Sequence, residues 1–214
     1  REMMADLTKQ WDAALRTPEA DAGAVADQVE EIAKWLHDET DDGRYLCDFL
    51  VERGYAVHAL ARPSTTEREH SRRVTWHEAD ITDGCRVRAV VRDVAPDEIY
   101  NLAAQSHVGK SFQQAVHTLH VNGIGAIHVL EAAREVGCKF YQASTSELFG
   151  SIAPPQHENV GFSPRSPYAI AKLAAHLATV NYREAYDLFA CNGILFNHES
   201  PLRGHEFVTR KITR

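Results

Sequence analysis

From residue 43 onward, short apolar segments alternate with longer segments of helical periodicity, and this alternation is the feature that most limits the possible fold. The expected strands are Tyr55–Leu60, Val74–Glu78, Glu98–Leu102, Phe140–Ser144 and Phe189–Leu195. The expected helices are Arg44–Glu52, Cys85–Val94, Val121–Val136 and Pro167–Tyr186. Strands joined by helices of this length are typical of a parallel sheet with helices on both faces. The sequence therefore predicts an α/β fold with a doubly wound parallel sheet over residues 43–214.

Residues 1–42 have a different pattern. Apolar residues recur there every three or four positions, as at Leu7, Trp11 and Leu15, with charged residues between them. This spacing predicts amphipathic helices. Ala, Glu, Gln and Lys dominate residues 23–38, so we expect a helix in that range. We interpret residues 1–42 as a helical N-terminal segment, either a cap left from another module or a pair of partner-binding helices.

Composition excludes several classes of protein. The net charge of −7 and the lack of a long Lys/Arg run argue against a nucleic-acid binder. No apolar run reaches the roughly 20 residues that span a bilayer. The 4 cysteines show no CxxC spacing, which favours reduced thiols and a cytoplasmic protein. His117 and His120 lie three apart without a carboxylate or cysteine to complete a metal site, so we expect no metal.

Tyr168 and Lys172 form a YxxxK pattern at the start of the last expected helix. Residues four apart share one face of a helix, so the ammonium group can lie near the phenol. A nearby cation lowers the pKa of a tyrosine from its usual value of about 10, and the phenolate can then act as a base. By itself this spacing is weak, because Tyr and Lys are common on helix surfaces.

A second polar segment, Ser144–Gly150, directly follows the apolar run Lys139–Ala143. Ligands of open parallel sheets bind beyond the carboxyl ends of the strands. If the chain stays extended there, Thr145 and Glu147 face the same side and present a hydroxyl and a carboxylate. The alternative is a simple turn in which Ser and Thr bond to the backbone. Together with the YxxxK pattern, the segment favours a functional site.

Four segments carry a resemblance to a known family. They are NLAAQSHV at 101–108, FYQASTSELFG at 140–150, PRSPYAIAK at 164–172 and NGILFNHESP at 192–201. With them, residues 42–214 resemble the GDP-mannose 4,6-dehydratase group of the extended short-chain dehydrogenase/reductase family. The resemblance implies a Rossmann-type domain that binds NADP, a homo-oligomer, and conversion of GDP-mannose to GDP-4-keto-6-deoxymannose by internal redox and loss of water.

The resemblance also implies roles for individual residues. Tyr168 would take the proton from the hydroxyl on carbon 4, and Thr145 would hydrogen-bond that oxygen. Glu147 would remove the proton from carbon 5 and help water to leave carbon 6. Lys172 would hold the nicotinamide ribose and tune Tyr168. The implied substrate contacts are Ser106, Thr145, Asn197 and Lys211, although Lys211 also fits a simple surface cation.

The implied cofactor contacts lie along the predicted strand ends. They are Gly43, Arg62, Asp80, Ile81, Leu102, Ala103, Ala104, Gln105, Ser106, Lys172, His198 and Arg203. Asp80 matches the adenine-contacting aspartate of the family. Arg62 suits a 2′-phosphate, which favours NADP over NAD, because a guanidinium binds phosphate with two hydrogen bonds. The alternative is that Arg62 is a solvated cation at a strand end.

The chain departs from the family pattern at its start. The family has a GxxGxxG turn whose glycines let the backbone approach a pyrophosphate. Here His37 and Thr40 occupy the first two glycine positions, and only Gly43 remains. We therefore expect the sheet to lack its first strand between those beginning near Tyr55 and Glu98, with unpaired edges that favour aggregation.

We also expect the substrate domain that follows in the family to be absent from this chain. Two functions then stay open. The first is a dehydratase-type enzyme, incomplete or inactive as this chain. The second is a catalytically silent nucleotide-fold protein whose N-terminal helices bind a partner.

Overall fold

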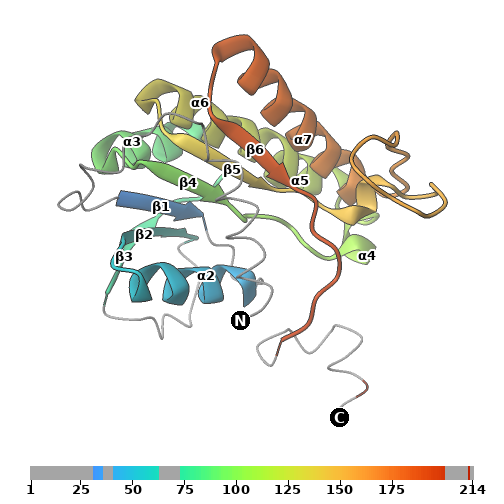
Figure 1. Ribbon diagram of the computed structural model, residues 1–214, viewed down its shortest axis with the longest axis horizontal. Coiled ribbons are helices and arrows are strands. Elements are labelled where there is room, and N and C mark those ends of the chain that lie inside the picture. Colours follow the sequence, from blue (N-terminus) through green and yellow to red (C-terminus); the bar gives the residue numbers. More distant parts are fainter. Residues whose placement is uncertain (1–30, 36–40, 63–72, 201–211, 213–214) are drawn as a thin grey trace.

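The computed structural model describes residues 31–35, 41–62, 73–200 and 212, and its centre is a parallel sheet (Figure 1). The strands are β1 (Glu31–Trp35), β2 (Ala56–Ala61), β3 (Val74–Glu78), β4 (Glu98–Asn101), β5 (Lys139–Ala143) and β6 (Ala190–Gly193). Their order is β3-β2-β1-β4-β5-β6, and every neighbouring pair is parallel. The chain thus builds one half of the sheet outward from β1 and then the other half. This order confirms the predicted doubly wound sheet.

Helices cover both faces of this sheet. They are α2 (Asp41–Glu52), α3 (Gly84–Val94), α4 (Val108–Ser111), α5 (Ala115–Leu119), the π-helix η1 (His120–Ile124), α6 (Gly125–Val136), the 3₁₀ turn η2 (Ser146–Leu148) and α7 (Pro167–Tyr186). Figure 1 shows α2 on one face and the layer of α3, α6 and α7 on the other. The prediction did not include α4 or α5, which lie between β4 and the long helical segment.

The prediction that the sheet lacks its first strand is wrong. Residues Glu31–Trp35 form β1, which pairs with β2 on one side and with β4 on the other. The helix expected over residues 23–38 is therefore contradicted at 31–35, and its remaining residues lie outside those the structure describes. Good helix formers occupy this segment, but a central slot pairs backbone groups on both sides, and that tertiary gain overrides helix propensity.

Two apolar clusters hold the layers together. Val87 and Val91 of α3 pack with Ile99, Val129 and Phe140 between the sheet and the α3–α6 layer. On the other face, a separate cluster joins α2 to β2, with Cys47, Leu50, Val57 and Ala59 among its members. Each fully buried Val, Leu or Phe side chain contributes roughly 1.5–3 kcal/mol relative to an exposed one. The α2 cluster therefore secures the first βα unit of the sheet.

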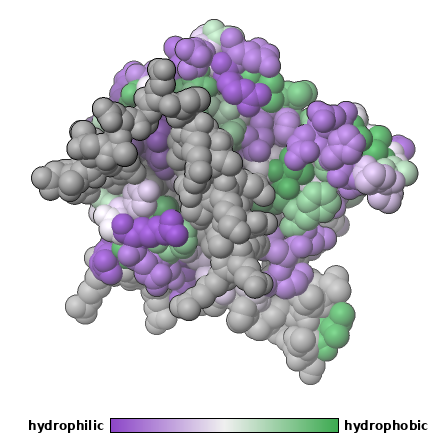
Figure 2. Space-filling model, in the orientation of Figure 1, coloured by the Kyte–Doolittle hydropathy of each residue, from purple (hydrophilic) through white to green (hydrophobic). Residues whose placement is uncertain are grey.

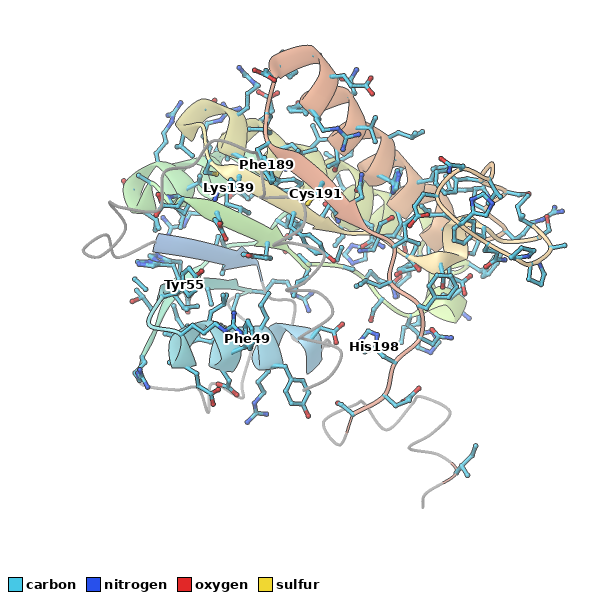
Figure 3. The ribbon with its side chains drawn as sticks, viewed as in Figure 1. Phe49, Tyr55, Lys139, Phe189, Cys191 and His198 are labelled. Atoms are coloured by element: carbon cyan, nitrogen blue, oxygen red, sulfur yellow. The ribbon has the colours of Figure 1, made fainter. Side chains whose placement is uncertain are left out.

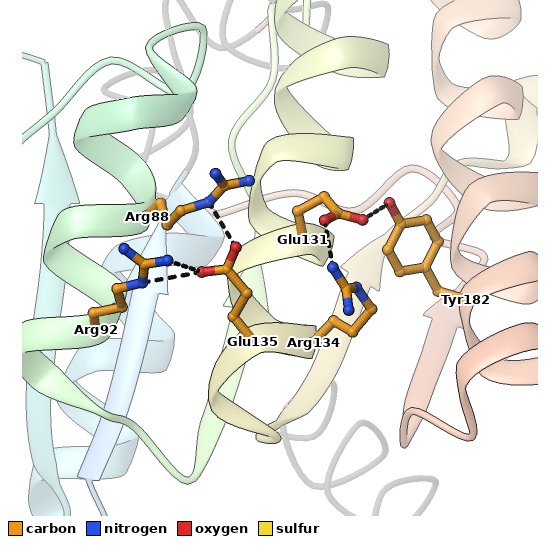
Figure 4. Close-up of polar contacts among 6 residues, drawn as sticks. All are labelled: Arg88, Arg92, Glu131, Arg134, Glu135 and Tyr182. Atoms are coloured by element: carbon orange, nitrogen blue, oxygen red, sulfur yellow. Dashed lines mark hydrogen bonds and ion pairs between the residues drawn. The ribbon is translucent and has the colours of Figure 1, made fainter.

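Polar contacts on the outer surface tie α3, α6 and α7 to one another (Figure 4). Glu135 of α6 accepts ion pairs from Arg88 and Arg92 of α3 at 2.9 and 2.8 Å. Glu131 of α6 binds Arg134 and Tyr182, and these hydrogen bonds lower the pKa of its carboxyl group.

Exposed pairs of this kind contribute at most about 1 kcal/mol each, so they align the helices more than they stabilise them. Hydrophilic residues also dominate the top of the surface in Figure 2, where α7 ends.

All strands of the sheet point the same way, so their carboxyl ends form one edge. In Figure 1 this edge faces α4 and the start of α7. The carboxyl edge is where open parallel sheets bind their ligands. Among the described residues, no helix is long and apolar enough to cross a membrane.

Candidate functional site

The end of β5 supplies the first part of the site. Thr145 has extended backbone and caps η2, and its Oγ1 accepts a hydrogen bond from the Glu147 backbone N at 3.2 Å. The chain therefore turns at Ser146 instead of staying extended, so alternate residues do not share one face as a strand would require. Thr145 is buried, whereas Glu147 is exposed at the edge of the sheet.

The start of α7 supplies the second part. Ser166 caps the helix by accepting a hydrogen bond from the Ala169 backbone N at 3.1 Å, and Pro167 follows at the first helical position. Both choices are typical of a stable helix start. Tyr168 and Lys172 then lie on the buried face of α7, with 9% and 3% of their surfaces exposed. The predicted shared helix face is confirmed.

The two parts meet at Tyr168. Burial raises the pKa of Tyr168, a side-chain hydrogen bond with Thr145 lowers it, and the negative charge of Glu147 raises it. The hydrogen bond places Thr145 beside the phenol, and Glu147 lies near enough for its charge to act on it. The expectation that Lys172 lowers the pKa of Tyr168 is not met in this chain. Burial outweighs the other influences, and the Lys172 Nζ is directed at a carbonyl.

Lys172 joins this part of α7 to the end of β5. Its Nζ donates a hydrogen bond to the Ala143 carbonyl at the end of β5, at 3.0 Å. Burial lowers the pKa of Lys172 to about 8, because a charged amine is disfavoured away from water. The residue thus connects α7 to β5 one helical turn beyond Tyr168.

The segment after β4 forms the third part of the site. Leu102, Ala103, Ala104 and Gln105 are buried, and the Ser106 Oγ is buried with no hydrogen-bond partner among the described residues. A buried hydroxyl without a partner is disfavoured, so it marks a position where a bound group can supply the missing bond. This observation fits the predicted ligand contact at Ser106.

Asn122 is a structural residue of this segment that the sequence analysis missed. Its Oδ1 accepts from the Gln105 backbone N at 2.7 Å, and its Nδ2 donates to the Gln105 carbonyl at 3.1 Å. Asn122 lies in η1, and π-helices occur frequently at functional sites. The available signal was a polar residue beside two glycines, Gly123 and Gly125, inside an otherwise helical pattern.

The remaining cofactor candidates lie along the same edge. Asp80 follows β3, and its Oδ1 accepts hydrogen bonds from the Thr82 N and Oγ1 at 2.8 and 2.7 Å. Ile81 is buried against Gly125, and Arg62 is half-buried directly after β2. The structure therefore brings the strand-end candidates to one side of the sheet.

The start of α2 is joined to the segment that follows β6. Gly43 is buried in the first turn of α2, and the neighbouring Asp42 Oδ1 lies 2.6 Å from His198 Nε2. Figure 3 shows His198 on the irregular segment that runs down from β6. Residues 156 positions apart thus meet at the amino end of α2. Anions are favoured at such helix ends.

Some predicted residues stay outside this cluster. Asn197 is exposed and lies next to His198. Arg203, Lys211, His37 and Thr40 lie outside the described residues. No group of three or more potential metal ligands occurs within the part of the chain that the structure describes.

Comparisons with known proteins identify close relatives. A family model described as GDP-mannose 4,6 dehydratase matches residues 41–214. The curated "GDP-mannose 4,6-dehydratase" of Vibrio cholerae is 51% identical over 190 residues, covering 81% of this chain and 51% of that protein. The human "GDP-mannose 4,6 dehydratase" is 49% identical, with the same two coverages. The chain spans about half the length of the curated relatives it matches.

Solved structures agree on the fold. UDP-glucose 4-epimerase from Thermotoga maritima, solved with UDP-glucose, has a TM-score of 0.69 and 26% identity. UDP-glucose 4-epimerase from Thermus thermophilus, solved with NAD, has a TM-score of 0.67 and 26% identity. Each match covers 74% of this chain and 52% of the solved chain.

Proposed function

The chain belongs to the GDP-mannose 4,6-dehydratase family, and from this premise we propose that its site dehydrates GDP-mannose to GDP-4-keto-6-deoxymannose. The observation that carries the proposal is the hydrogen bond of Thr145 with Tyr168, within reach of the charge of Glu147 and one helical turn before Lys172. This arrangement gathers a hydroxyl donor, a phenol and a carboxylate at the ligand-binding edge of the sheet.

In the proposed reaction, each side chain either transfers a proton or hydrogen-bonds an oxygen of the substrate. Tyr168 takes the proton from the hydroxyl on carbon 4, while Thr145 hydrogen-bonds that oxygen as it becomes a ketone. The ketone acidifies carbon 5. Glu147 then removes the proton from carbon 5 and returns a proton to the hydroxyl that leaves carbon 6 as water. When a hydride reaches carbon 6, Tyr168 returns its proton to carbon 5, so that the protons of the reaction balance.

NADP is the cofactor that we propose. When bound, it would supply the hydride acceptor for carbon 4 and the hydride donor for carbon 6. The unpartnered Ser106 Oγ and the oriented carboxylate of Asp80 support a dinucleotide along this edge. Lys172 would hold the ribose, and Arg62 would pair with a 2′-phosphate, which distinguishes NADP from NAD. Gly43, Ile81, Leu102–Gln105, His198 and Arg203 are the further proposed contacts.

Substrate contacts and assembly belong to the same proposal. Ser106, Thr145, Asn197 and Lys211 are the proposed substrate contacts. Homo-oligomerisation is supported by apolar side chains exposed on α5, η1 and α7, namely Val116, Leu119, Ile124, Ile170 and Leu177. A cytoplasmic location is supported by the four cysteines, none of which forms a disulfide.

Glu147→Gln tests the proposed role of the carboxylate. The substitution keeps the size and hydrogen bonding of the side chain but removes the base. With GDP-mannose in deuterated water and millimolar NADP, we expect the unmodified chain to incorporate deuterium at carbon 5 and the variant to incorporate none. The measurement is mass spectrometry of the recovered sugar nucleotide.

Oxidation at carbon 4, followed as a transient rise in NADPH absorbance, should survive in the variant. Glu158→Gln, an exposed carboxylate outside the site, serves as the matched control. Undiminished exchange in Glu147→Gln would transfer proton abstraction to another residue. Absence of exchange and of product in the unmodified chain would contradict the proposed function for this chain.

A further inference from the structure

A hydrogen bond joins the end of β5 to the middle of α7 and takes no part in the chemistry proposed above. The Ser144 Oγ lies 3.0 Å from the His176 Nδ1. Ser144 is buried, with 4% of its surface exposed, and it directly precedes Thr145. His176 is half-buried and lies one helical turn beyond Lys172. The pair thus lies one residue from Thr145 and one helical turn from Lys172.

Two consecutive turns of α7 therefore bind two consecutive residues of the β5 end. Lys172 donates to the Ala143 carbonyl at 3.0 Å, and His176 bonds to Ser144 one turn later. Residues four apart on a helix share a face, so both bonds point at the same strand. This double attachment restrains both sliding of the helix along the strand and rotation about its own axis.

β6 joins the same attachment point. The Asn192 Nδ2 donates to the His176 carbonyl at 3.1 Å, and Asn192 pairs with Gln142 in the β5–β6 register. The Phe162 ring packs edge-on against the His176 ring, with centroids 5.1 Å apart. His176 therefore makes contacts through its backbone carbonyl, through its ring and through its Nδ1.

We propose that Ser144 and His176 are positioning residues of the dehydratase site, which hold the end of β5 against α7 and so keep Thr145 and Lys172 in register with Tyr168. The inference rests on the proposed function for its catalytic consequence. A misplacement of about 1 Å in such a site can reduce turnover roughly a hundredfold, so a bond that fixes two elements beside Thr145 and Lys172 affects the rate.

The charge state of His176 suits this role. Burial and then the positive charge of Arg183 lower the pKa of His176, which favours the neutral ring. A neutral imidazole has one donor and one acceptor nitrogen. The Ser144 hydroxyl can donate to Nδ1, or the other tautomer can donate to the Ser144 Oγ. The attachment forms in either case.

The test uses four variants. Ser144→Ala removes the hydroxyl, and His176→Phe keeps a ring against Phe162 but removes the bond. His176→Asn keeps a polar atom near the position of Nδ1. Thr179→Val is the matched control, because Thr179 is also buried on α7 but its Oγ1 bonds to the Ala175 carbonyl within the helix.

The first readout does not depend on activity. The pKa of Lys172 is followed through its ¹³Cε chemical shift, assigned with Lys172→Arg. In Ser144→Ala and His176→Phe we expect this pKa to rise from about 8, because water reaches the amine when β5 and α7 separate. In His176→Asn and Thr179→Val we expect it to stay within about 0.3 units of the unmodified chain.

The second readout is turnover of GDP-mannose. We expect kcat to fall about tenfold in Ser144→Ala and His176→Phe with KM within about twofold, which is the pattern of impaired transition-state geometry. His176→Asn should recover most of the loss. The double variant Ser144→Ala/His176→Phe should be no slower than either single variant, because both changes remove the same bond.

The outcomes separate the two proposals. The unmodified chain could show no turnover while Ser144→Ala and His176→Phe still shift the pKa of Lys172. That result would support the attachment and contradict the proposed function. Turnover in the unmodified chain, with neither kcat nor the Lys172 pKa changed in Ser144→Ala and His176→Phe, would overturn the inference. An equal effect in Thr179→Val would overturn it as well.

Discussion

At the scale of single residues, the burial of Lys172 lowers the stability of the fold, and the same residue has a proposed function. Its amine is almost fully buried, and its hydrogen-bond partner is the neutral carbonyl of Ala143. A buried charge without an opposite charge is disfavoured, which is why the pKa falls to about 8. Residues kept at such a cost to stability are typical of functional sites.

The pH dependence of stability tests this feature. The pKa of Lys172 is about 8 in the folded chain and 10.5 in the unfolded chain, so between these pH values the unfolded state binds the extra proton. Stability therefore rises with pH across this window and loses that gain as pH falls through 8. We compare the unfolding free energies of the unmodified chain and of Lys172→Met. From pH 8 to pH 10.5 we expect the difference to move by up to about 3 kcal/mol in favour of the unmodified chain.

Chemical denaturation at a series of pH values measures this difference, and other titrating groups cancel because both proteins carry them. Lys110→Met, which removes an exposed lysine, should give a flat difference over the same window. A flat difference for Lys172→Met would mean that the amine is solvated in the folded chain.

At the scale of elements, the turn that ends the Ser144–Gly150 segment is defined by one glycine. Gly150 has a φ of +51°, and a Cβ atom built on it would lie 1.9 Å from the Ser163 carbonyl oxygen. The Ser163 N also donates to the Leu148 carbonyl at 2.9 Å, so the two backbone segments are in direct contact. The close approach holds η2, and with it Glu147, at the edge of the sheet.

We expect Gly150→Ala to destabilise the chain by roughly 1–3 kcal/mol, because the new methyl group forces the two backbone segments apart. Thermal or urea unfolding measures the change. Gly161→Ala is the matched control, since nothing lies within 4 Å of a Cβ built there and its φ is not in the left-handed region. Equal stability of the two variants would contradict the close approach.

At the scale of the whole molecule, the presence of β1 limits the consequence of the two missing glycines to cofactor binding. The central slot of the sheet is filled, so the aggregation expected from unpaired neighbours loses its basis. The replacement of two glycines by His37 and Thr40 remains. Side chains at these positions oppose the close backbone approach that a pyrophosphate requires.

We therefore expect the chain to bind NADPH weakly, with a dissociation constant well above the low micromolar range. Fluorescence titration of NADPH measures the affinity. The double variant His37→Gly/Thr40→Gly should bind at least about tenfold more tightly, because it restores the backbone access. Low-micromolar binding by the unmodified chain would show that other residues form the pyrophosphate site.

The exposed apolar side chains of α5, η1 and α7 lead to a second expectation at this scale. Val116 and Leu177 are 85% and 53% exposed, and burial against a second copy would remove both from water. We expect a concentration-dependent dimer by analytical ultracentrifugation, which Val116→Asp/Leu177→Asp abolishes. Glu158→Gln, far from this face in sequence, should leave the dimer intact. A monomer at all concentrations would contradict the proposed assembly.

The sequence by itself determined the local and repeating features. The periodicity of residues 43–214 predicted β2 to β6 and the helices α2, α3, α6 and α7, within a few residues at each end. The spacing of Tyr168 and Lys172 predicted their shared helix face, and the strand-end position of Thr145 predicted its place at the carboxyl edge of the sheet. These features follow from side-chain period and from the polarity of parallel strands, both of which are local properties.

Only the tertiary structure decided β1, the conformation at Glu147 and the attachment between Ser144 and His176. Residues 31–35 carry good helix formers, and their strand exists because β2 and β4 offer paired backbone groups on both sides. The pKa of Tyr168 rises because packing removes water, which no spacing in the sequence reveals. Ser144 and His176 are 32 positions apart, and they meet only because α7 folds back across the end of β5.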